Sequence, residues 1–409
     1  MKLSKSDPKI YNLIKKEEKR QQETLNLIAS ENYPSKPVRE ALSSIFVAKY
    51  SEGRPYKRYY GGMKVIDELE TLVQERAKKA FKLNPKKWSV NVQPLSGAPA
   101  NYEILRSLVP LHEKILCLHL PHGGHLSQGA KASLTGHDFK PIYYYLDKNG
   151  FLNYKEIEKL AKKEKPKLIM AGYTAYPRQV NFKRFGQIAK KVGAYLLADT
   201  SHITGLIIGG VHPNPFPWAD VLMTTTHKTL RGPRGAMIIC RKELEKKIFP
   251  KVFPGMQGGP HQHTICAIGV ALKEAMAPKF KKYAVQIVKN TKALAVGLKK
   301  YNFNLVSGGS DNHLVLVDLR NKNITGKPAQ ELLEKAGIVT NRNTIPYDSR
   351  PAYDPSGIRL GTPALTTRGM KEKEMRKIAS WIAEVITNPK SCSRIQKEVK
   401  KLCQKFPIP

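Results

Sequence analysis

Short apolar runs alternate with amphipathic helical stretches over residues 60–280 of the chain. Four of these runs have the length and composition of buried strands: Lys167–Gly172, Ala194–Asp199, Asp220–Thr225 and Ala236–Cys240. Strands that alternate with helices in this way favour an α/β unit with a largely parallel sheet.

The polar residues that follow these runs predict where ligands bind. In parallel sheets, ligands gather at the carboxyl ends of the strands. Here those ends carry Thr174, Asp199 with His202, and Lys228. We therefore expect the functional site at this edge of the sheet.

Beyond about residue 280 the pattern restarts and predicts a smaller α+β domain. A long helical stretch is followed by two apolar segments and a final helix: His313–Leu319, Ser356–Leu365 and Glu372–Ile386. The expected organisation has three parts: an N-terminal helical arm at 1–55 that contacts a partner subunit, a large α/β domain at 56–280, and the small domain at 281–409.

The formal net charge is +37, from 70 Lys and Arg against 33 Asp and Glu. The basic residues occur mostly as pairs on helical stretches, such as Lys162-Lys163, without a single basic block or interleaved aromatic residues. This distribution favours a solvated, lysine-rich surface. Nucleic acid remains a possible partner only for a secondary, charge-driven interaction.

Cysteine usage and hydropathy indicate a cytoplasmic protein. The five cysteines are odd in number and lack CxxC spacing, which favours neither a disulfide framework nor a zinc site. The first 22 residues are too charged for a signal peptide. No apolar run approaches the ~18–20 residues that span a bilayer, so no membrane association is expected.

The stretch TTTHKTLRGPRG places Lys228 at the end of a predicted strand, among small polar residues. Partial burial and the nearby cations Arg231 and Arg234 would disfavour its ammonium form, leaving free amine to attack a carbonyl group. The alternative is a solvent-facing lysine in a loop.

Two further charged residues lie in apolar strands and therefore need partners. Asp199 could pair with a protonated pyridine nitrogen or with a basic side chain of the protein. Arg359, beside glycines in SGIRLGTP, suits bidentate pairing with a carboxylate, which could belong to a substrate or to the protein.

Two glycine-containing stretches complete the set of candidate ligand contacts. Ser96-Gly97 precede a helical pattern with Pro99 in its first turn, so the helix N-terminus could bind a phosphate. In HGGHLSQG, His125 could stack on a planar ring. His122 lies three residues earlier, but no nearby acidic or histidine set completes a metal site, and we expect no metal.

Together these candidates describe a pyridoxal-phosphate enzyme that acts on an amino acid. They comprise a lysine with a reactive amine, an acid for a ring nitrogen, a phosphate-binding turn, a histidine that stacks on a ring and an arginine that binds a carboxylate. Seven segments of the chain, between Glu23 and Ile386, resemble the successive signatures of bacterial serine hydroxymethyltransferases: LIASENY, KYSEGRPYKRYYGG, HGGHLSQG, TTTHKTLRGPRG, FPGMQGGP, SGGSDNHLVLVDL and SGIRLGTPALTTRG.

The resemblance implies a fold-type-I, aspartate-aminotransferase-like enzyme that is at least an obligate homodimer, and it leaves open whether two dimers pair into a tetramer. Such an enzyme reversibly transfers the serine hydroxymethyl carbon to tetrahydrofolate, giving glycine and 5,10-methylenetetrahydrofolate. Pyridoxal 5'-phosphate would be held covalently on Lys228, with tetrahydrofolate as co-substrate.

Carried over position by position, the resemblance also implies roles for individual residues. The catalytic set would be Lys228, Glu52, His125, Asp199, His202, Tyr60 and Thr225. The cofactor would further contact Ser96, Gly97, Thr174, Tyr50, Gly258 and Gly259, of which Tyr50 would assist near the phosphate and both glycines would come from the partner subunit. The substrates would contact Ser30, Arg359, Glu52, Tyr60, Tyr59, Leu120, Gly124, Leu126 and Asn343.

Several of these roles are specific. His125 would stack on the cofactor ring, and His202 would contact its phenolic oxygen. Arg359 would bind the substrate carboxylate with help from Ser30. Glu52 would come from the neighbouring subunit, as would Tyr60, and would manage the proton of the serine hydroxyl or of the folate. The pteridine would lie among Tyr59, Leu120, Leu126 and Asn343.

The chain departs from the family pattern around the expected phosphate cup and ring. Leu95, Ala98 and Pro99 stand where the family usually reads HSGSQAN, which removes one phosphate hydroxyl. Loss of such a charge-assisted hydrogen bond would lower cofactor affinity ~10-fold unless a nearby group substitutes. Thr200 and Ser201 replace the usual Met-Ala before His202. These changes leave open a folate-independent β-hydroxy amino acid aldolase of the threonine type, or a modified folate carrier.

Overall fold

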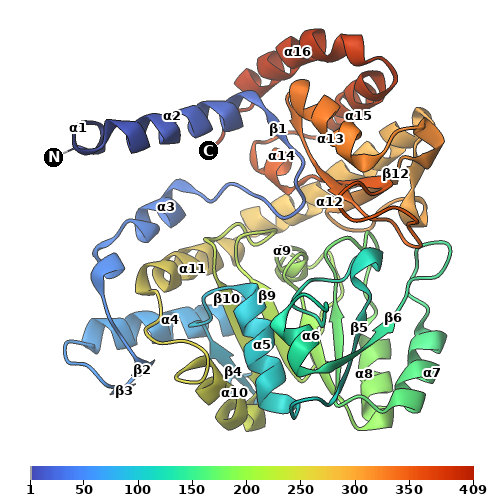
Figure 1. Cartoon of the computed structure of the whole chain (residues 1–409). Helices are drawn as coiled ribbons and strands as arrows, with labels where there is room; N and C mark the ends of the chain where they lie inside the picture. The colour runs from blue at the N-terminus through green and yellow to red at the C-terminus, as the bar shows by residue number, and fades with distance from the viewer. Residues whose placement is uncertain (1) are drawn as a thin grey trace.

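The computed structural model describes residues 2–409 and contains a large seven-stranded sheet, seen in the lower half of Figure 1. The strand order is β4-β10-β9-β8-β7-β5-β6. The strands are β4 (Trp88–Asn91), β5 (Lys114–Leu118), β6 (Lys140–Tyr144), β7 (Leu168–Gly172), β8 (Tyr195–Asp199), β9 (Val221–Thr225) and β10 (Ala236–Arg241). The four strands expected from the sequence are confirmed, each to within one residue at either end.

The directions of the strands confirm a mostly parallel, mixed sheet. Strands β5 to β9 are parallel, whereas β10 runs antiparallel to both β9 and β4. Gly172 pairs with Asp199, which in turn pairs with Met223, so β7, β8 and β9 end side by side. The polar residues that follow these strands therefore share one edge, as expected.

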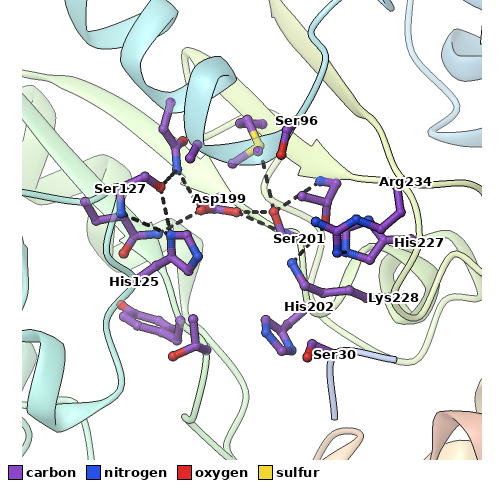
Figure 2. Close-up of a pocket in the computed structure, with 18 of the residues that line it drawn as sticks. Ser30, Ser96, His125, Ser127, Asp199, Ser201, His202, His227, Lys228 and Arg234 are labelled. Carbon is purple, nitrogen blue, oxygen red and sulfur yellow. Dashed lines mark hydrogen bonds between the residues drawn. The ribbon is translucent and has the colours of Figure 1, made fainter. Parts of the chain in front are cut away.

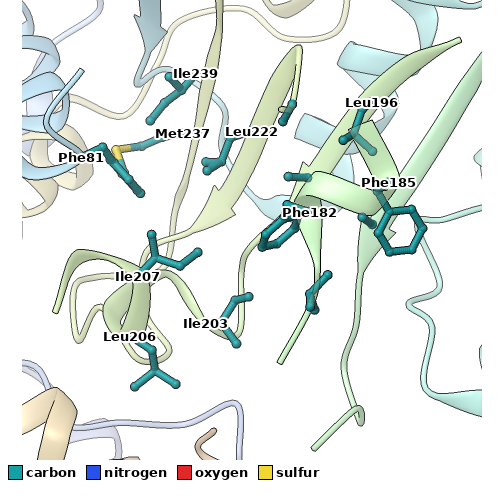
Figure 3. Close-up of a cluster of buried hydrophobic side chains, with 14 of the residues drawn as sticks. Phe81, Phe182, Phe185, Leu196, Ile203, Leu206, Ile207, Leu222, Met237 and Ile239 are labelled. Carbon is teal, nitrogen blue, oxygen red and sulfur yellow. The ribbon is translucent and has the colours of Figure 1, made fainter. Parts of the chain in front are cut away.

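Helices cover both faces of this sheet because alternate strand residues point to opposite sides. Val221 and Met223 pack in a core with α5 (Gly97–Leu108) and α10 (Glu245–Val252). The intervening Leu222 packs in the opposite core, where Figure 3 shows it near Met237 and Ile239. Helices on that second face include α4 (Lys64–Ala80), α7 (Tyr154–Glu164), α8 (Phe182–Val192), α9 (Thr204–Ile208) and α11 (Gln262–Ala275).

A smaller antiparallel sheet forms the C-terminal part, with the order β11-β12-β15-β14. Its strands are β11 (Asn304–Leu305), β12 (Leu314–Asp318), β14 (Asn341–Asn343) and β15 (Gly357–Gly361). Helices α12 (Pro278–Lys300), α13 (Gly326–Lys335), α15 (Glu372–Thr387) and α16 (Cys392–Lys405) pack around it. The smaller α+β unit and the helix expected at Glu372–Ile386 are thus present, whereas α16 was not expected from the sequence.

One expected apolar segment divides into two elements. Ser356–Leu365 contains strand β15, which stops at Gly361, and the short helix α14 (Pro363–Thr367) begins two residues later. Proline fixes its own φ and lacks an N–H, so it suits the first helical position and cannot continue a strand ladder. The change of structure at Pro363 follows from that chemistry.

The N-terminal segment contacts the C-terminal part of the chain. Strand β1 (Leu25–Asn26) pairs in parallel with β13 (Ile338–Val339), and the backbone N–H of Gly361 donates to Leu27 O at 2.7 Å. Leu25 and Leu27 are fully buried in the C-terminal core. The remaining helices and short strands are α1 (Leu3–Ser6), α2 (Pro8–Glu23), α3 (Lys36–Leu42), α6 (Leu134–Asp138), β2 (Gly53–Arg54) and β3 (Lys57–Arg58).

The long helices are amphipathic and their basic pairs face solvent. Lys162 and Lys163 on α7 have side chains that are 59% and 80% exposed. Within residues 2–409 we find no helix that combines the length and the apolar character needed to cross a bilayer. The five cysteines are all unpaired.

Arg368, buried at the end of α14, joins both ends of the chain. Its guanidinium donates to Thr24 O at 2.8 Å, to Cys403 O at 2.9 Å and to Phe406 O at 2.6 Å. All three acceptors are backbone carbonyl oxygens. Arg368 therefore ties the segment that follows α2 to the C-terminal end of α16. Figure 1 shows α2 and α16 lying next to each other at the top of the molecule.

Replacement of Arg368 by methionine should loosen the N-terminal arm. Hydrogen bonds to a charged donor contribute about 1.5–3 kcal/mol each, and every 1.4 kcal/mol is tenfold in an equilibrium constant. We expect limited proteolysis within α2 to accelerate at least about tenfold. The matched control is Arg376→Met on α15, an exposed arginine, which should leave the cleavage rate unchanged. Equal cleavage of both variants would contradict this prediction.

Candidate active site

A cavity of about 390 Å³ lies at the carboxyl edge of the large sheet, beside the C-terminal domain (Figure 2). It collects most of the residues expected to bind the cofactor, but of those expected to bind the substrates it collects only Ser30 and Arg359. Among its lining residues are Ser30, Ser96, Gly97, His125, Thr174, Asp199, His202, Thr225, Lys228 and Arg359. The location therefore agrees with the expectation drawn from the strand ends.

Lys228 follows β9 and is 9% exposed, so the alternative of a solvent-facing lysine is wrong. Its Nζ donates a hydrogen bond to Thr225 Oγ1 at 2.9 Å. Burial, followed by the positive charges of Arg359 and Arg234, lowers the pKa of Lys228 to about 8, against the opposing effect of Asp199. At this pKa roughly a tenth of the lysine is nucleophilic amine at pH 7, which is on the order of a hundred times more than for a lysine at its usual pKa.

Arg231 does not contribute to this effect, contrary to expectation. Its guanidinium lies 4.8 Å from the centre of the Tyr283 ring and 3.7 Å from Glu274. The turn after Lys228 carries Arg231 away from the cavity, at a positive φ of 64°. Arg359, from the distant strand β15, takes its place as a neighbouring cation.

Asp199 is buried at the end of β8 and accepts hydrogen bonds only from neutral donors within residues 2–409. Oδ2 accepts from Gln128 Nε2 at 2.8 Å and Asn101 Nδ2 at 3.1 Å. Oδ1 accepts from the hydroxyl and the backbone N–H of Ser201, at 2.6 and 3.1 Å. The alternative of a protein salt bridge at Asp199 is therefore wrong, and the carboxylate remains available to a cationic ligand group.

His125 lies beside Asp199 in Figure 2 and presents a neutral ring to the cavity. Burial lowers the pKa of His125. Its Nδ1 accepts a hydrogen bond from the backbone N–H of Ser127 at 3.1 Å and contacts the Ser127 hydroxyl at 2.8 Å. A ring fixed in this way can stack on a planar group.

The other side of the cavity in Figure 2 carries Ser96, His227 and Arg234. Ser96 precedes α5, and its hydroxyl makes no capping hydrogen bond within the described chain. Gly97 is required here because a Cβ would lie 2.6 Å from Thr225 Cγ2. Arg234 contacts His227 Nε2 at 3.3 Å. A helix N-terminus, a free hydroxyl and an arginine together suit an anion such as phosphate.

Ala98 lines the cavity at this end, at a position where the family pattern has a hydroxyl that binds the phosphate. Arg234 supplies a charged donor in the same region, and no carboxylate of residues 2–409 forms an ion pair with it. Arg234 is therefore the nearby group that could offset the loss at Ala98.

Arg359 is 8% exposed, and its partners within the described chain are neutral. Its Nε donates to Asn341 Oδ1 at 3.1 Å and its Nη1 to Thr174 O at 2.7 Å. Burial lowers the pKa of Arg359 to about 10, so the guanidinium stays charged at neutral pH. Arg359 therefore does not pair with a carboxylate of the described chain, which was one of the two alternatives left open by the sequence. The other alternative, a carboxylate of a bound substrate, fits its free donors.

Five residues expected at the site form a second cluster, and none of them lines the cavity. Tyr50 and Tyr60 donate hydrogen bonds to Glu52, each at 3.4 Å. A Cβ on Gly258 would lie 3.2 Å from Glu52 Oε1, and one on Gly259 would lie 3.3 Å from the Tyr50 ring. The side chains of Tyr50 and Tyr60 are exposed, and that of Glu52 is partly buried.

The residues expected around a pteridine also lie outside the cavity. Leu120 and Leu126 are 37% and 53% exposed, and Tyr59 is 76% exposed. Asn343 donates to Thr344 O at 2.7 Å, and the Thr344 hydroxyl donates to Pro121 O at 2.9 Å, which brings the Asn343 and Leu120 loops together. Gly124 packs tightly, since a Cβ there would lie 2.3 Å from Leu118 O.

The sequence analysis missed several residues that shape the cavity. Asn101 and Gln128 bind Asp199, and Tyr173 and Met223 line the wall. Asn101 lies one helical turn after Gly97, a spacing that could have indicated a shared face. Within residues 2–409, no group of three or more His, Cys, Asp or Glu side chains is arranged to hold a metal ion.

The donor set fits a phosphorylated pyridine aldehyde. A buried amine, an unpaired carboxylate and a neutral ring surround one cavity, with an anion cradle at one end and an arginine free for a carboxylate. With the α/β sheet and smaller C-terminal unit, these features define a fold-type-I, pyridoxal-phosphate-dependent enzyme.

Comparison with known proteins gives the family. The serine hydroxymethyltransferase family model matches residues 3–382. Relatives named serine hydroxymethyltransferase come from Desulfotalea psychrophila (51% identical, covering 100% of this chain and 96% of the relative), Methanosarcina barkeri (51%, covering 99% of both) and Acidothermus cellulolyticus (48%, covering 100% and 97%). The chain belongs to the serine hydroxymethyltransferase family.

The amine of Lys228 should titrate near pH 8 in the cofactor-free protein. Only the neutral amine reacts, so its acylation rate should rise with pH, reach half its maximum at about 8 and then level off. Competitive labelling followed by mass spectrometry of peptides measures this profile. Lys15 is the internal control, because a hydrogen bond from its ammonium to Glu18 raises its pKa above 10.5. A Lys228 midpoint near 10.5 would contradict the prediction.

Proposed function

We propose that this chain reversibly transfers the serine hydroxymethyl carbon to tetrahydrofolate, with Lys228 holding pyridoxal 5'-phosphate covalently. Membership of the serine hydroxymethyltransferase family supports the reaction. The single observation that supports the site is the buried Lys228, whose pKa is lowered to about 8. When bound, the cofactor supplies an electron sink for charge that develops on the amino acid substrate as a bond to its α-carbon breaks.

The residues of the cavity would hold the cofactor in one orientation. Asp199 would keep a proton on the ring nitrogen, while Asn101, Gln128 and Ser201 fix the position of its carboxylate. His125 would pack against the ring face. Ser96 and Gly97 would donate to the phosphate, joined by Arg234, and His202 and Thr174 would lie near the phenolic oxygen.

Arg359 would bind the carboxylate of serine or glycine, with Ser30 assisting from the N-terminal segment. Thr174 O and Asn341 already occupy two of its donors and so fix the direction of the rest. Thr225 would position Lys228 through the hydrogen bond to its Nζ. The amino acid is thereby placed between a carboxylate-binding site and the lysine.

The second cluster would complete the site of a partner subunit in a homodimer. Tyr50, Glu52, Tyr60, Gly258 and Gly259 lie together on one chain, away from that chain's own Lys228 cavity. In this arrangement Glu52 would give or take the proton of the serine hydroxyl or the folate. Further association of dimers into a tetramer stays compatible with this proposal.

The pteridine of tetrahydrofolate would bind at the mouth of the cavity. Leu120, Leu126 and Tyr59 offer exposed apolar surface, and Asn343 offers an amide. Retention of Glu52 and Tyr59 favours this reaction over the folate-independent aldolase. We also retain the proposed parts at 1–55, 56–280 and 281–409, a cytoplasmic location, and nucleic acid binding only as a secondary, charge-driven interaction.

Serine cleavage should depend on both tetrahydrofolate and Lys228. Purified protein loaded with pyridoxal phosphate should form glycine from labelled serine much faster with tetrahydrofolate than without it. Lys228→Ala should abolish turnover and covalent cofactor binding, because no other lysine of residues 2–409 lines the cavity. Equal rates with and without tetrahydrofolate, together with rapid cleavage of threonine-type substrates, would favour the aldolase.

Mixed dimers should reveal whether Glu52 acts in the partner's site. Glu52→Gln alone should lower kcat roughly 10²–10⁴-fold, the usual contribution of a general acid or base. After subunit exchange between the Glu52→Gln and Lys228→Ala proteins, about half of the dimers would be hybrids with one intact site each. Activity should recover to about one quarter of wild type. No recovery, despite hybrids visible by native mass spectrometry, would place Glu52 in its own chain's site.

A further inference from the structure

Two buried histidines contact each other at the junction of the two sheets. His202 follows β8 and lines the Lys228 cavity, whereas His313 immediately precedes β12 and does not. His202 Nδ1 lies 3.0 Å from His313 Nε2, and the side chains belong to residues that are 5% and 1% exposed. A contact of this length between ring nitrogens is a hydrogen bond, in which one ring donates and the other accepts.

Both rings are neutral at physiological pH. Burial, reinforced by Arg359 and then by the nearby His212 and Lys228, lowers the pKa of His313 to about 3. Burial and then Lys228 lower the pKa of His202 well below its usual value. Each imidazole therefore carries a single proton, and the position of one proton fixes that of the other.

The surroundings of His313 select one of the two arrangements. Its Nδ1 is buried without a hydrogen-bond partner within residues 2–409. If His202 donated to His313 Nε2, the proton of His313 would sit on that Nδ1 as a buried, unsatisfied N–H. The opposite arrangement leaves only an unused lone pair there. Orphaned buried N–H groups are the rarer case in folded proteins, so His313 donates and His202 accepts.

This assignment determines what His202 offers to the cavity. With Nδ1 accepting from His313, the single proton of His202 resides on Nε2. That nitrogen has no hydrogen bond within the described chain, and it belongs to a ring that lines the cavity. His202 is therefore a hydrogen-bond donor toward a bound ligand.

We propose that His313 is a positioning residue that fixes the tautomer of His202, so that His202 Nε2–H donates to an anionic oxygen of the ligand. The proposal rests on the proposed function, in which that oxygen is the phenolic oxygen of the cofactor. His313 itself touches neither cofactor nor substrate. The donor is set only when the C-terminal sheet is packed against the large sheet.

His212 provides a matched control for substitutions at His313. It is also a buried histidine, 6% exposed, and burial lowers its pKa to about 4. Its Nδ1 donates to Pro213 O at 3.1 Å, and it makes no hydrogen bond to His202. His212→Leu and His313→Leu each remove one buried imidazole, but only the second removes the donor to His202.

The test compares His313→Leu, His313→Gln and His212→Leu in the dimeric holoenzyme. His313→Leu should weaken pyridoxal phosphate binding about tenfold or more, since a hydrogen bond to a charged acceptor is lost. The cofactor's absorption band should also shift. A glutamine amide can donate from the position of the His313 Nε2 atom, so His313→Gln should stay within about threefold of wild type. His212→Leu should resemble wild type in cofactor affinity and spectrum.

A direct reading of the tautomer in the wild-type protein does not depend on activity or on tolerance of the His313 substitutions. Nitrogen NMR of histidine-labelled wild-type protein, assigned with His202→Asn, should show His202 protonated at Nε2 with and without cofactor. Protonation at Nδ1, or equal effects of the two leucine variants, would overturn the proposal. Failure of the proposed function would appear differently, as wild-type protein without folate-dependent serine cleavage while the His202 signal remains that of the Nε2 tautomer.

Discussion

Lys228, Asp199 and Arg359 are buried around one cavity, and the surrounding fold has to offset the cost of burying their charges. Each charged side chain lacks an ion-pair partner within the described chain and is held by neutral donors or acceptors. Removing unpaired charges from water costs several kcal/mol for each ion. Two extensive apolar cores on the faces of the large sheet, and a third in the C-terminal part, offset that cost.

The charges also explain why the cavity is built from distant segments. Asp199 and Lys228 come from adjacent strands of one sheet, whereas Arg359 comes from the other sheet and contacts Thr174 O. The electrostatic effect of Arg359 on Lys228 thus depends on the packing of two separate units. The packing of the C-terminal unit against the large sheet therefore contributes to the reactivity of the Lys228 amine.

Much of the fold and part of the site were predictable from local sequence. Apolar runs of five or six residues ended at polar residues, and the parallel topology then placed Asp199 and Lys228 at one edge. The contacts of Gln128 and Asn101 with Asp199 were not predictable, because 71 and 98 residues separate the partners. The histidine pair spans 111 residues for the same reason. Arg231 was misplaced because its turn direction depends on a backbone conformation that the sequence pattern does not reveal.

The pairing of β1 with β13 has a consequence for the order in which this molecule is assembled. Leu25 and Asn26 find their strand partners at Ile338 and Val339, more than three hundred residues later in the chain. During synthesis the early segment emerges long before those partners exist, and contacts of such sequence separation form slowly. Ser30, which follows this segment and lines the cavity, reaches its place only after the C-terminal unit has been made. The large sheet can therefore fold first, with the pocket left open until the chain is nearly complete.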